Sequence, residues 1–176
     1  MGIASGPIFP LIAGKSFPSF PPDPTSGQNT EPESDRPGSR PAVLLVEDNP
    51  PDAYVIDRVL KRCGVPIDLR VVSDGEQALA IFQQSEADAD YSQPSLILLD
   101  WNLPGLSGAD VLGYVRRSER LRDVPVVIVT STSSPAEVRE MRRLGATAHF
   151  RKPTDLEAYL DLNRIVLEIL PKPRAS

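Results

Sequence analysis

The sequence predicts an α/β fold in which five parallel strands form a doubly wound sheet with the order 2-1-3-4-5. Three observations predict it. From residue 42 onward, short apolar runs alternate with longer helix-like segments, as in successive βαβ units with right-handed crossovers. Three of the runs are almost unbroken Val, Ile and Leu, as expected where helices cover both faces of a sheet. Four runs end at charged or hydroxyl residues, which is typical of the carboxyl edge where open sheets bind ligands.

Each predicted strand is a short run of apolar residues bounded by polar or turn-forming residues. The predicted order sets the first and third strands side by side at a topological switch point, where the winding of the chain reverses. The five expected strands are Ala42–Glu47, Asp68–Val72, Ser95–Leu99, Pro125–Val129 and Thr147–Arg151.

The helices that follow the first three strands have recognisable limits. Asn49 is the expected N-cap of the first helix, with prolines in its first turn and Gly64 after its end. The second helix is expected after Asp74-Gly75-Glu76 and is followed by a polar loop over Gln84–Pro94. The third is expected at about Gly108–Arg117.

The last two helices are each predicted to begin with a capping box. The fourth has Ser134–Glu137 as its box and stops at Gly145, and the fifth has Thr154–Glu157. Both carry apolar residues at helical spacing, which would turn one face of each helix towards the sheet.

The two ends of the chain differ from the predicted domain, which spans residues 42–171. Residues 1–41 hold nine of the 19 prolines and show neither helical nor strand periodicity. Such a segment buries too little apolar surface to offset its chain entropy, so we expect a disordered extension. Only a short tail, residues 172–176, follows the domain, so any signal is expected to leave through protein contacts.

Composition excludes several classes of function. A net charge of -5 with scattered basic residues argues against a nucleic-acid surface. Cys63 is the only cysteine, which rules out an internal disulfide or a cysteine metal cluster. The sequence has no apolar run long enough to span a membrane and no basic segment of a secretory signal. A cytoplasmic protein without membrane or nucleic-acid partners is therefore expected.

The residues at the four polar strand ends suggest one site. Glu47-Asp48 follows the first strand, Asp100 the third, Thr130 the fourth and Lys152 the fifth. Three carboxylates at one edge repel one another unless a cation is present. Mg²⁺ suits such a site because it binds carboxylate, carbonyl and water oxygens and can also bridge to a phosphate oxygen. Two acids, an acid, a hydroxyl and a lysine in this order indicate a phosphoryl-acceptor site.

These landmarks, with Pro104 and Gly108 downstream of Asp100, resemble the receiver domain of two-component response regulators. The resemblance covers about residues 42–171 and implies a flavodoxin-like receiver fold. Within the family, the stretch Leu98–Pro104 is similar to that of bacterial single-domain regulators that partner phytochrome-type histidine kinases. The resemblance implies a signalling phosphoprotein in a phosphorelay, not an enzyme beyond its own phosphorylation and dephosphorylation.

Roles for the site residues follow from this resemblance and from the chemistry of the groups. Asp100 is expected to be the nucleophile that accepts a phosphoryl group from a phosphohistidine of the kinase. Asp48, Asp100 and the backbone carbonyl of Asn102 are the expected direct ligands of Mg²⁺, and Glu47 is expected to hold it through water. Lys152 and the Thr130 hydroxyl would stabilise the charge that develops on the phosphoryl oxygens.

Two features beside Lys152 bear on switching. The resemblance suggests a cis peptide before Pro153, which X-Pro bonds permit and which would aim the lysine inward. His149, the only histidine, stands three residues before Lys152, where many receivers have Tyr or Phe. It is either a switch residue that changes rotamer together with Thr130 or an ordinary packing or surface histidine.

Two other readings of the site and one of the surface stay open. An aspartate-nucleophile phosphohydrolase would need a second acid two residues after the nucleophile, where this chain has Asn102. A pseudo-receiver would bind partners without phosphorylation. The fourth helix, fifth strand and fifth helix carry apolar residues among charged ones, from which we expect an exposed patch and a homodimer through this face. The apolar residues concerned are Val138, Met141, Tyr159 and Leu162.

Overall fold

The computed structural model describes residues 40–62, 67–88, 90–132, 134–155 and 157–170. All of them belong to one compact unit. Almost all of the predicted N-terminal extension, the C-terminal tail and Cys63 lie outside the described residues. No helix within the described part of the chain is long and apolar enough to cross a membrane.

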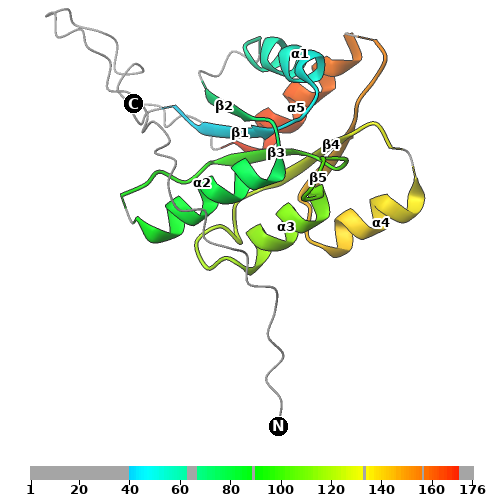
Figure 1. Cartoon of the computed structure of the whole chain (residues 1–176). Coiled ribbons are helices and arrows are strands. Elements are labelled where there is room, and N and C mark those ends of the chain that lie inside the picture. Colours follow the sequence, from blue (N-terminus) through cyan, green and yellow to red (C-terminus); the bar gives the residue numbers. More distant parts are fainter. Residues whose placement is uncertain (1–39, 63–66, 89, 133, 156, 171–176) are drawn as a thin grey trace, which may run out of the picture. The chain divides into compact units, whose positions relative to one another are not determined.

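The described residues form a five-stranded parallel sheet with helices between its strands (Figure 1). The strand order is β2-β1-β3-β4-β5, as predicted, with β1 paired to both β2 and β3. The strands are β1 (Ala42–Val46), β2 (Asp68–Val72), β3 (Leu96–Asp100), β4 (Val126–Thr130) and β5 (Ala148–Arg151). The helices are α1 (Pro50–Leu60), α2 (Gly75–Ala87), α3 (Gly108–Arg117), α4 (Pro135–Arg143) and α5 (Leu160–Ile169), with a 3-10 turn, η2 (Glu157–Tyr159), before α5.

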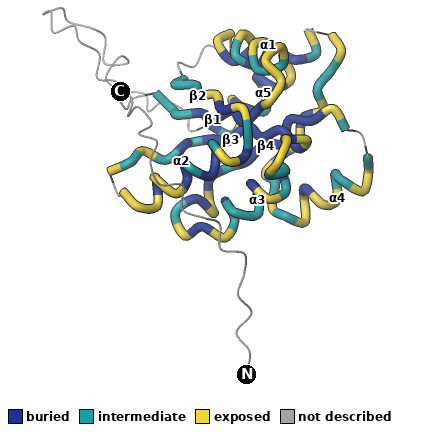
Figure 2. The backbone as a smooth tube through the Cα atoms, in the orientation of Figure 1, coloured by how far each residue is buried: buried dark blue, intermediate teal, exposed yellow. Residues whose placement is uncertain are grey.

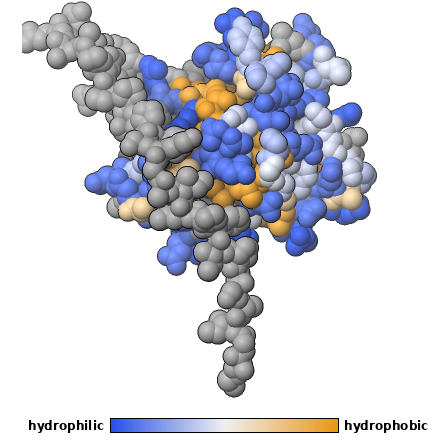
Figure 3. Space-filling model, viewed as in Figure 1, coloured by the Kyte–Doolittle hydropathy of each residue, from blue (hydrophilic) through white to orange (hydrophobic). Residues whose placement is uncertain are grey.

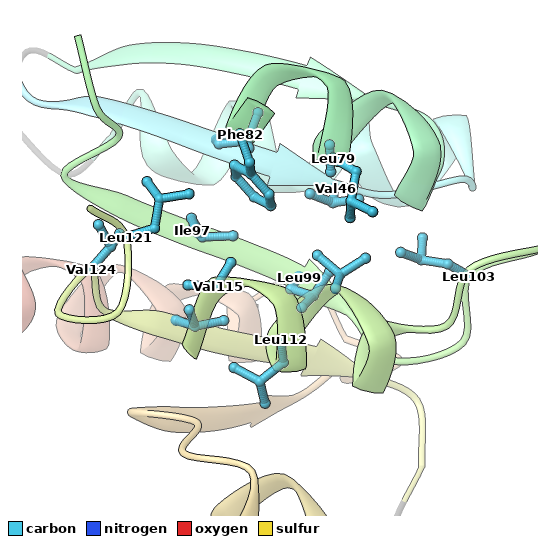
Figure 4. Packing of buried hydrophobic residues seen from close by; sticks show 14 of the residues in the cluster. Val46, Leu79, Phe82, Ile97, Leu99, Leu103, Leu112, Val115, Leu121 and Val124 are labelled. Carbon is cyan, nitrogen blue, oxygen red and sulfur yellow. The ribbon is translucent and has the colours of Figure 1, made fainter. Parts of the chain in front are cut away.

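Helices cover both faces of the sheet, with α1 and α5 on one face and α2, α3 and α4 on the other (Figure 1). Alternate residues of each central strand point to opposite faces. In β3, Ile97 and Leu99 therefore pack with Phe82 and Leu112 in one core cluster (Figure 4), while Leu98 packs with the α1 and α5 side chains in the other. All five residues of β3 and of β4 are buried, which explains their unbroken aliphatic sequence and appears as continuous dark blue in Figure 2.

Side chains cap the starts of α1, α2 and α3, and the Asn49 cap of α1 was predicted. The Asn49 side chain accepts a hydrogen bond from the Asp52 amide at 3.3 Å, and the Asp74 side chain accepts one from the Gln77 amide at 2.8 Å. At α3, Ser107 and Asp110 form a reciprocal capping box. These bonds satisfy backbone donors that have no partner inside a helix.

Two predicted boundaries are wrong. Residues 84–87 were expected in a loop but continue α2, because a polar stretch can extend a helix along its solvent-exposed side. The capping box predicted at Thr154 is replaced by a bond from the Glu157 amide to the Asp155 side chain at 3.0 Å. The chain then passes through η2, so α5 begins only at Leu160.

The apolar patch predicted on α4, β5 and α5 is also wrong. Met141, Tyr159 and Leu162 are buried in the two core clusters, and Val138 is half-buried. Large exposed hydrophobic residues within the described ranges are Tyr54, Val71, Leu160 and Leu167, of which the last two lie on α5. Hydrophilic residues make up most of the face drawn in Figure 3, with smaller groups of hydrophobic residues between them.

Candidate functional site

The sheet register brings three predicted carboxylates together at the carboxyl ends of β1 and β3. Val46 pairs with Leu99 in the parallel ladder, so the next residue of each chain segment, Glu47 and Asp100, lies at the same level of the sheet. Carboxylate oxygens of Glu47, Asp48 and Asp100 lie within 4.8 Å of one another. Glu47 and Asp100 are buried, whereas Asp48 is exposed. The cluster is therefore open to solvent on one side only.

Lys152 reaches this cluster from the loop after β5. Its amide donates to the Thr130 carbonyl at 2.8 Å, which fixes the start of its side chain beside β4. Its ammonium nitrogen, Nζ, lies 2.7 Å from Asp100 Oδ2, 2.7 Å from Glu47 Oε2 and 2.9 Å from Asp52 Oδ2. The lysine side chain is only 6% exposed. One buried cation thus contacts three carboxylates.

Burial and neighbouring charges shift the pKa values of Glu47 and Lys152. Burial raises the pKa of Glu47 to about 7, and the Asp100 charge adds to the rise, although Lys152 opposes it. Burial by itself would lower the pKa of Lys152, but contacts with Asp100, Glu47 and Asp52 outweigh burial and raise it. Lys152 is consequently a permanent cation, while Glu47 can change its charge near neutral pH.

One buried oxygen of the cluster is incompletely satisfied. Glu47 Oε2 is close to Lys152 Nζ, but it accepts no hydrogen bond, since proximity of charges does not guarantee donor geometry. Its other oxygen, Oε1, accepts from the Asn49 amide at 3.3 Å. An unsatisfied buried carboxylate oxygen beside two further carboxylates fits a divalent cation that prefers oxygen ligands. The residues present could therefore hold such a metal.

The loop after β3 orients Asp100. Asp100 Oδ1 accepts a hydrogen bond from the Asn102 amide at 3.0 Å, while Oδ2 accepts from Lys152. Gly108 permits this loop to fold closely against α3, because a Cβ there would lie 2.5 Å from the Asp100 carbonyl oxygen and 2.8 Å from the Trp101 Cα. The carboxylate is thus held from both sides by donors.

Thr130 and His149 occupy different environments. The Thr130 side chain is fully buried at the end of β4, and its hydroxyl oxygen accepts from the Thr132 amide at 3.1 Å. His149 is exposed on β5, while its neighbour Phe150 is buried and packs against Tyr159. A switching role for His149 stays a prediction.

The cis peptide predicted before Pro153 is wrong, since that bond is trans. Lys152 points inward without it. The backbone bond to Thr130 sets the direction of the side chain, and the contacts with Asp100 and Asp52 hold its end.

Asp52 is the site residue that sequence reasoning missed. It lies in the first turn of α1, where acids commonly occur because they favour the positive end of the helix dipole. The available signal was topological. The start of the helix after β1 must lie above the same sheet edge as Asp48 and Lys152, so an acid in that first turn can reach the lysine.

Comparison with known proteins agrees with this geometry. Residues 43–163 match the response regulator receiver domain family. The chain is 37% identical over 127 residues to the probable methanogenesis regulatory protein FilR2 of Methanothrix harundinacea, which covers 72% of this chain and 79% of that protein. It is 32% identical over 124 residues to the response regulator Rcp1 of Synechocystis, covering 70% and 84% of the two chains.

Solved structures give the same result. The phosphorylated cyanobacterial phytochrome response regulator RcpA superposes with a TM-score of 0.68 at 28% identity, covering 77% of this chain and 97% of that one. The Mn²⁺-bound form of Rcp1 superposes with a TM-score of 0.66 at 28% identity, covering 74% and 99%. The resemblance found in the sequence and the flavodoxin-like receiver fold are both confirmed, and the chain belongs to the response regulator receiver domain family.

Proposed function

We propose that this chain accepts a phosphoryl group on Asp100 from a partner histidine kinase and passes the signal on through protein contacts. The observation that carries the proposal is the position of Asp100. It is the last residue of β3, is 5% exposed and lies 2.7 Å from the Lys152 ammonium nitrogen. A carboxylate that is held this way can act as an oriented nucleophile, since its geometry is fixed before the reaction begins.

The chemistry requires an oxygen of Asp100 to attack the phosphorus of a phosphohistidine. The new O–P bond forms as the P–N bond to the imidazole breaks, and the imidazole nitrogen keeps the electron pair of that bond. Charge spreads over the phosphoryl oxygens during transfer. Lys152, which carries a permanent positive charge, is positioned beside Asp100 to stabilise them. The Thr130 hydroxyl can donate a hydrogen bond to a phosphoryl oxygen, because it acts only as the acceptor in its bond with the Thr132 amide.

A divalent cation belongs to this proposal. Glu47, Asp48 and Asp100 are the side chains that would hold it, and the Asn102 carbonyl remains the expected backbone ligand. The bound ion, which we propose to be Mg²⁺, would neutralise the carboxylates and supply positive charge to the phosphoryl group. The Mn²⁺-bound form of Rcp1 supports a divalent ion in a similar protein. Without the cation, four acids share the single positive charge of Lys152, so an incoming phosphoryl group would be repelled.

The kinase partner is proposed to be of the phytochrome type. RcpA is a cyanobacterial phytochrome response regulator, and Rcp1 is the response regulator of Synechocystis that this chain resembles over 84% of its length. A cytoplasmic location is part of the same proposal. The protein would catalyse only its own phosphorylation and dephosphorylation.

Self-association through α4, β5 and α5 remains a prediction. The apolar side chains from which it was predicted do not form an exposed patch, because Met141, Tyr159 and Leu162 are buried. A dimer on this face would rely on other exposed side chains, such as Arg139 and Glu140 of α4 and Leu160 of α5. Light scattering at tens of micromolar, with and without a beryllofluoride mimic of the phosphoryl group, separates a dimer from a monomer.

The proposed function is tested by incubating the protein with a small phosphodonor and Mg²⁺ and measuring its intact mass. We expect an adduct of about 80 Da, the mass that phosphorylation adds, which disappears with EDTA and in Asp100→Asn. An adduct that persists in Asp100→Asn would assign the phosphoryl group to another residue. Absence of any adduct in the parent protein would favour a pseudo-receiver. Release of phosphate from unrelated monoesters would favour a phosphohydrolase.

A further inference from the structure

The contact between Asp52 and Lys152 has no part in the mechanism above. Asp52 Oδ2 accepts a hydrogen bond from Lys152 Nζ at 2.9 Å, across 100 residues of sequence. Its side chain is 30% exposed, against 7% for Asp100 and 0% for Glu47. Asp52 is therefore the partner of the lysine that lies closest to water.

Three carboxylates already surround the lysine ammonium group, and two of them, Asp52 and Asp100, accept its hydrogen bonds. An ammonium group carries three N–H donors, and Nζ already contacts three carboxylates. A phosphoryl oxygen on Asp100 that approaches Lys152 therefore competes with carboxylate oxygens that already lie within 2.9 Å of Nζ. Glu47 is enclosed by protein, so it would lose its contact without gaining water. Asp52 can turn towards solvent from the first turn of α1 at a smaller cost in solvation.

We propose that Asp52 is a positioning residue that holds Lys152 before phosphoryl transfer and competes with the phosphoryl group for it afterwards. The inference rests on the proposed function. Asp52 and Asp100 contact the same nitrogen atom, so the Asp52 charge also lies near the transferred group and repels it. Competition for the lysine and direct repulsion both weaken the phosphorylated state, while the negative charge of Asp52 helps to attract the metal ion.

The Asp52 charge is thus expected to strengthen metal binding and to weaken binding of the phosphoryl group. A residue with a purely structural role would change both affinities in the same direction. In Asp52→Asn the amide oxygen can still accept from Lys152, but the charge is lost. We expect Mg²⁺ to bind about three- to tenfold more weakly and beryllofluoride, at saturating Mg²⁺, to bind tighter by a similar factor, as for one partly screened charge at this range. Asp52→Glu, which restores the charge, should return both affinities towards the parent values.

Both affinities can be followed through the fluorescence of Trp101, the only tryptophan, which is buried and adjoins Asp100 in the sequence. The matched control is Asp57→Asn, which removes one charge from the same helix at an acid paired with Lys61 at 2.7 Å. We expect it to leave both affinities within about twofold, because Asp57 lies more than one turn further along α1 than Asp52 and its charge is already paired with Lys61.

Three results would overturn the proposal. They are unchanged affinities in Asp52→Asn, weaker binding of both ligands, or changes that Asp57→Asn reproduces. Failure of the underlying function looks different. In that case the parent protein itself would give no beryllofluoride response, or Asp100→Asn would respond as the parent does.

Discussion

In strands β1 and β3, the side chains along the strand differ in polarity from those at the carboxyl end, although both sets are buried. Over Val43–Val46 and Leu96–Leu99 every side chain is aliphatic and buried. In the next positions stand Glu47 and Asp100, which are just as buried but charged. Burial of the first region stabilises the fold by roughly 25 cal/mol per Å² of apolar surface. Burial of the second region destabilises the fold, because removal of charges from water is costly even when they are paired.

This difference indicates what each region is for. The core can hold an unfavourable arrangement in place because its own packing is tight on both sides of the sheet. The carboxyl edge concentrates acids around one lysine and leaves Glu47 Oε2 without a hydrogen bond. Proteins keep such local costs at sites that bind ligands. Mutations in the two regions should therefore change stability in opposite directions.

The largest effect on stability is expected in the core. Phe82 is fully buried and stacks on Tyr114 with ring centroids 6.0 Å apart. Phe82→Ala should lower the free energy of unfolding by about 3–5 kcal/mol, through lost transfer energy and the cavity that remains. Urea denaturation measures the change. Tyr54→Ala is the control, since Tyr54 is 64% exposed and its removal should cost less than about 1 kcal/mol.

A smaller and pH-dependent effect is expected at Glu47. Its pKa is raised from 4.5 to about 7 in the folded protein, so the folded state holds a proton that the unfolded chain has released between these values. This contribution to stability is complete below pH 4.5 and is lost as the pH rises through 7. In EDTA, the parent protein should lose roughly 2–3 kcal/mol more than Glu47→Gln between pH 5 and pH 8. Equal losses of stability in the two proteins would contradict the raised pKa of Glu47.

The smallest effect is expected at the N-terminal extension. A chain that begins at Arg40 should unfold within about 0.5 kcal/mol of the full chain, because a segment that buries little apolar surface adds little stability. Urea denaturation of both chains checks this expectation. A loss above roughly 2 kcal/mol would show that the extension packs on the domain, since this is a large part of a typical stability of 5–15 kcal/mol.

The fold was predictable because short, unbroken aliphatic runs alternate along the chain with helix-like segments. The aliphatic runs of β3 and β4 could only be strands covered on both faces, and parallel order then brought their polar ends to one edge. The predictions failed where local chemistry allowed two outcomes. At the predicted Thr154 box, the Glu157 amide donates to the Asp155 side chain, and α5 begins at Leu160 without a side-chain cap.

The site was predictable to the extent that its residues end strands. Glu47, Asp100 and Lys152 could be placed from the topology alone, but Asp52 could not be told from a common first-turn acid. Burial of Met141 and Leu162 was missed for a related reason. Helical spacing tells which residues share a face, but it does not tell how much of that face the sheet covers.

The central claim, that the acids of the carboxyl edge serve ligand binding at the expense of stability, is tested most directly with Asp48→Asn. The measurement is the free energy of unfolding with EDTA and with saturating Mg²⁺. Because the variant has one carboxylate fewer in a repelling cluster, we predict that it is at least as stable as the parent in EDTA. Mg²⁺ should stabilise the parent strongly, since it binds only the folded state, and the variant far less. A variant that is less stable than the parent in EDTA by more than about 1 kcal/mol, yet gains as much from Mg²⁺, would contradict the claim.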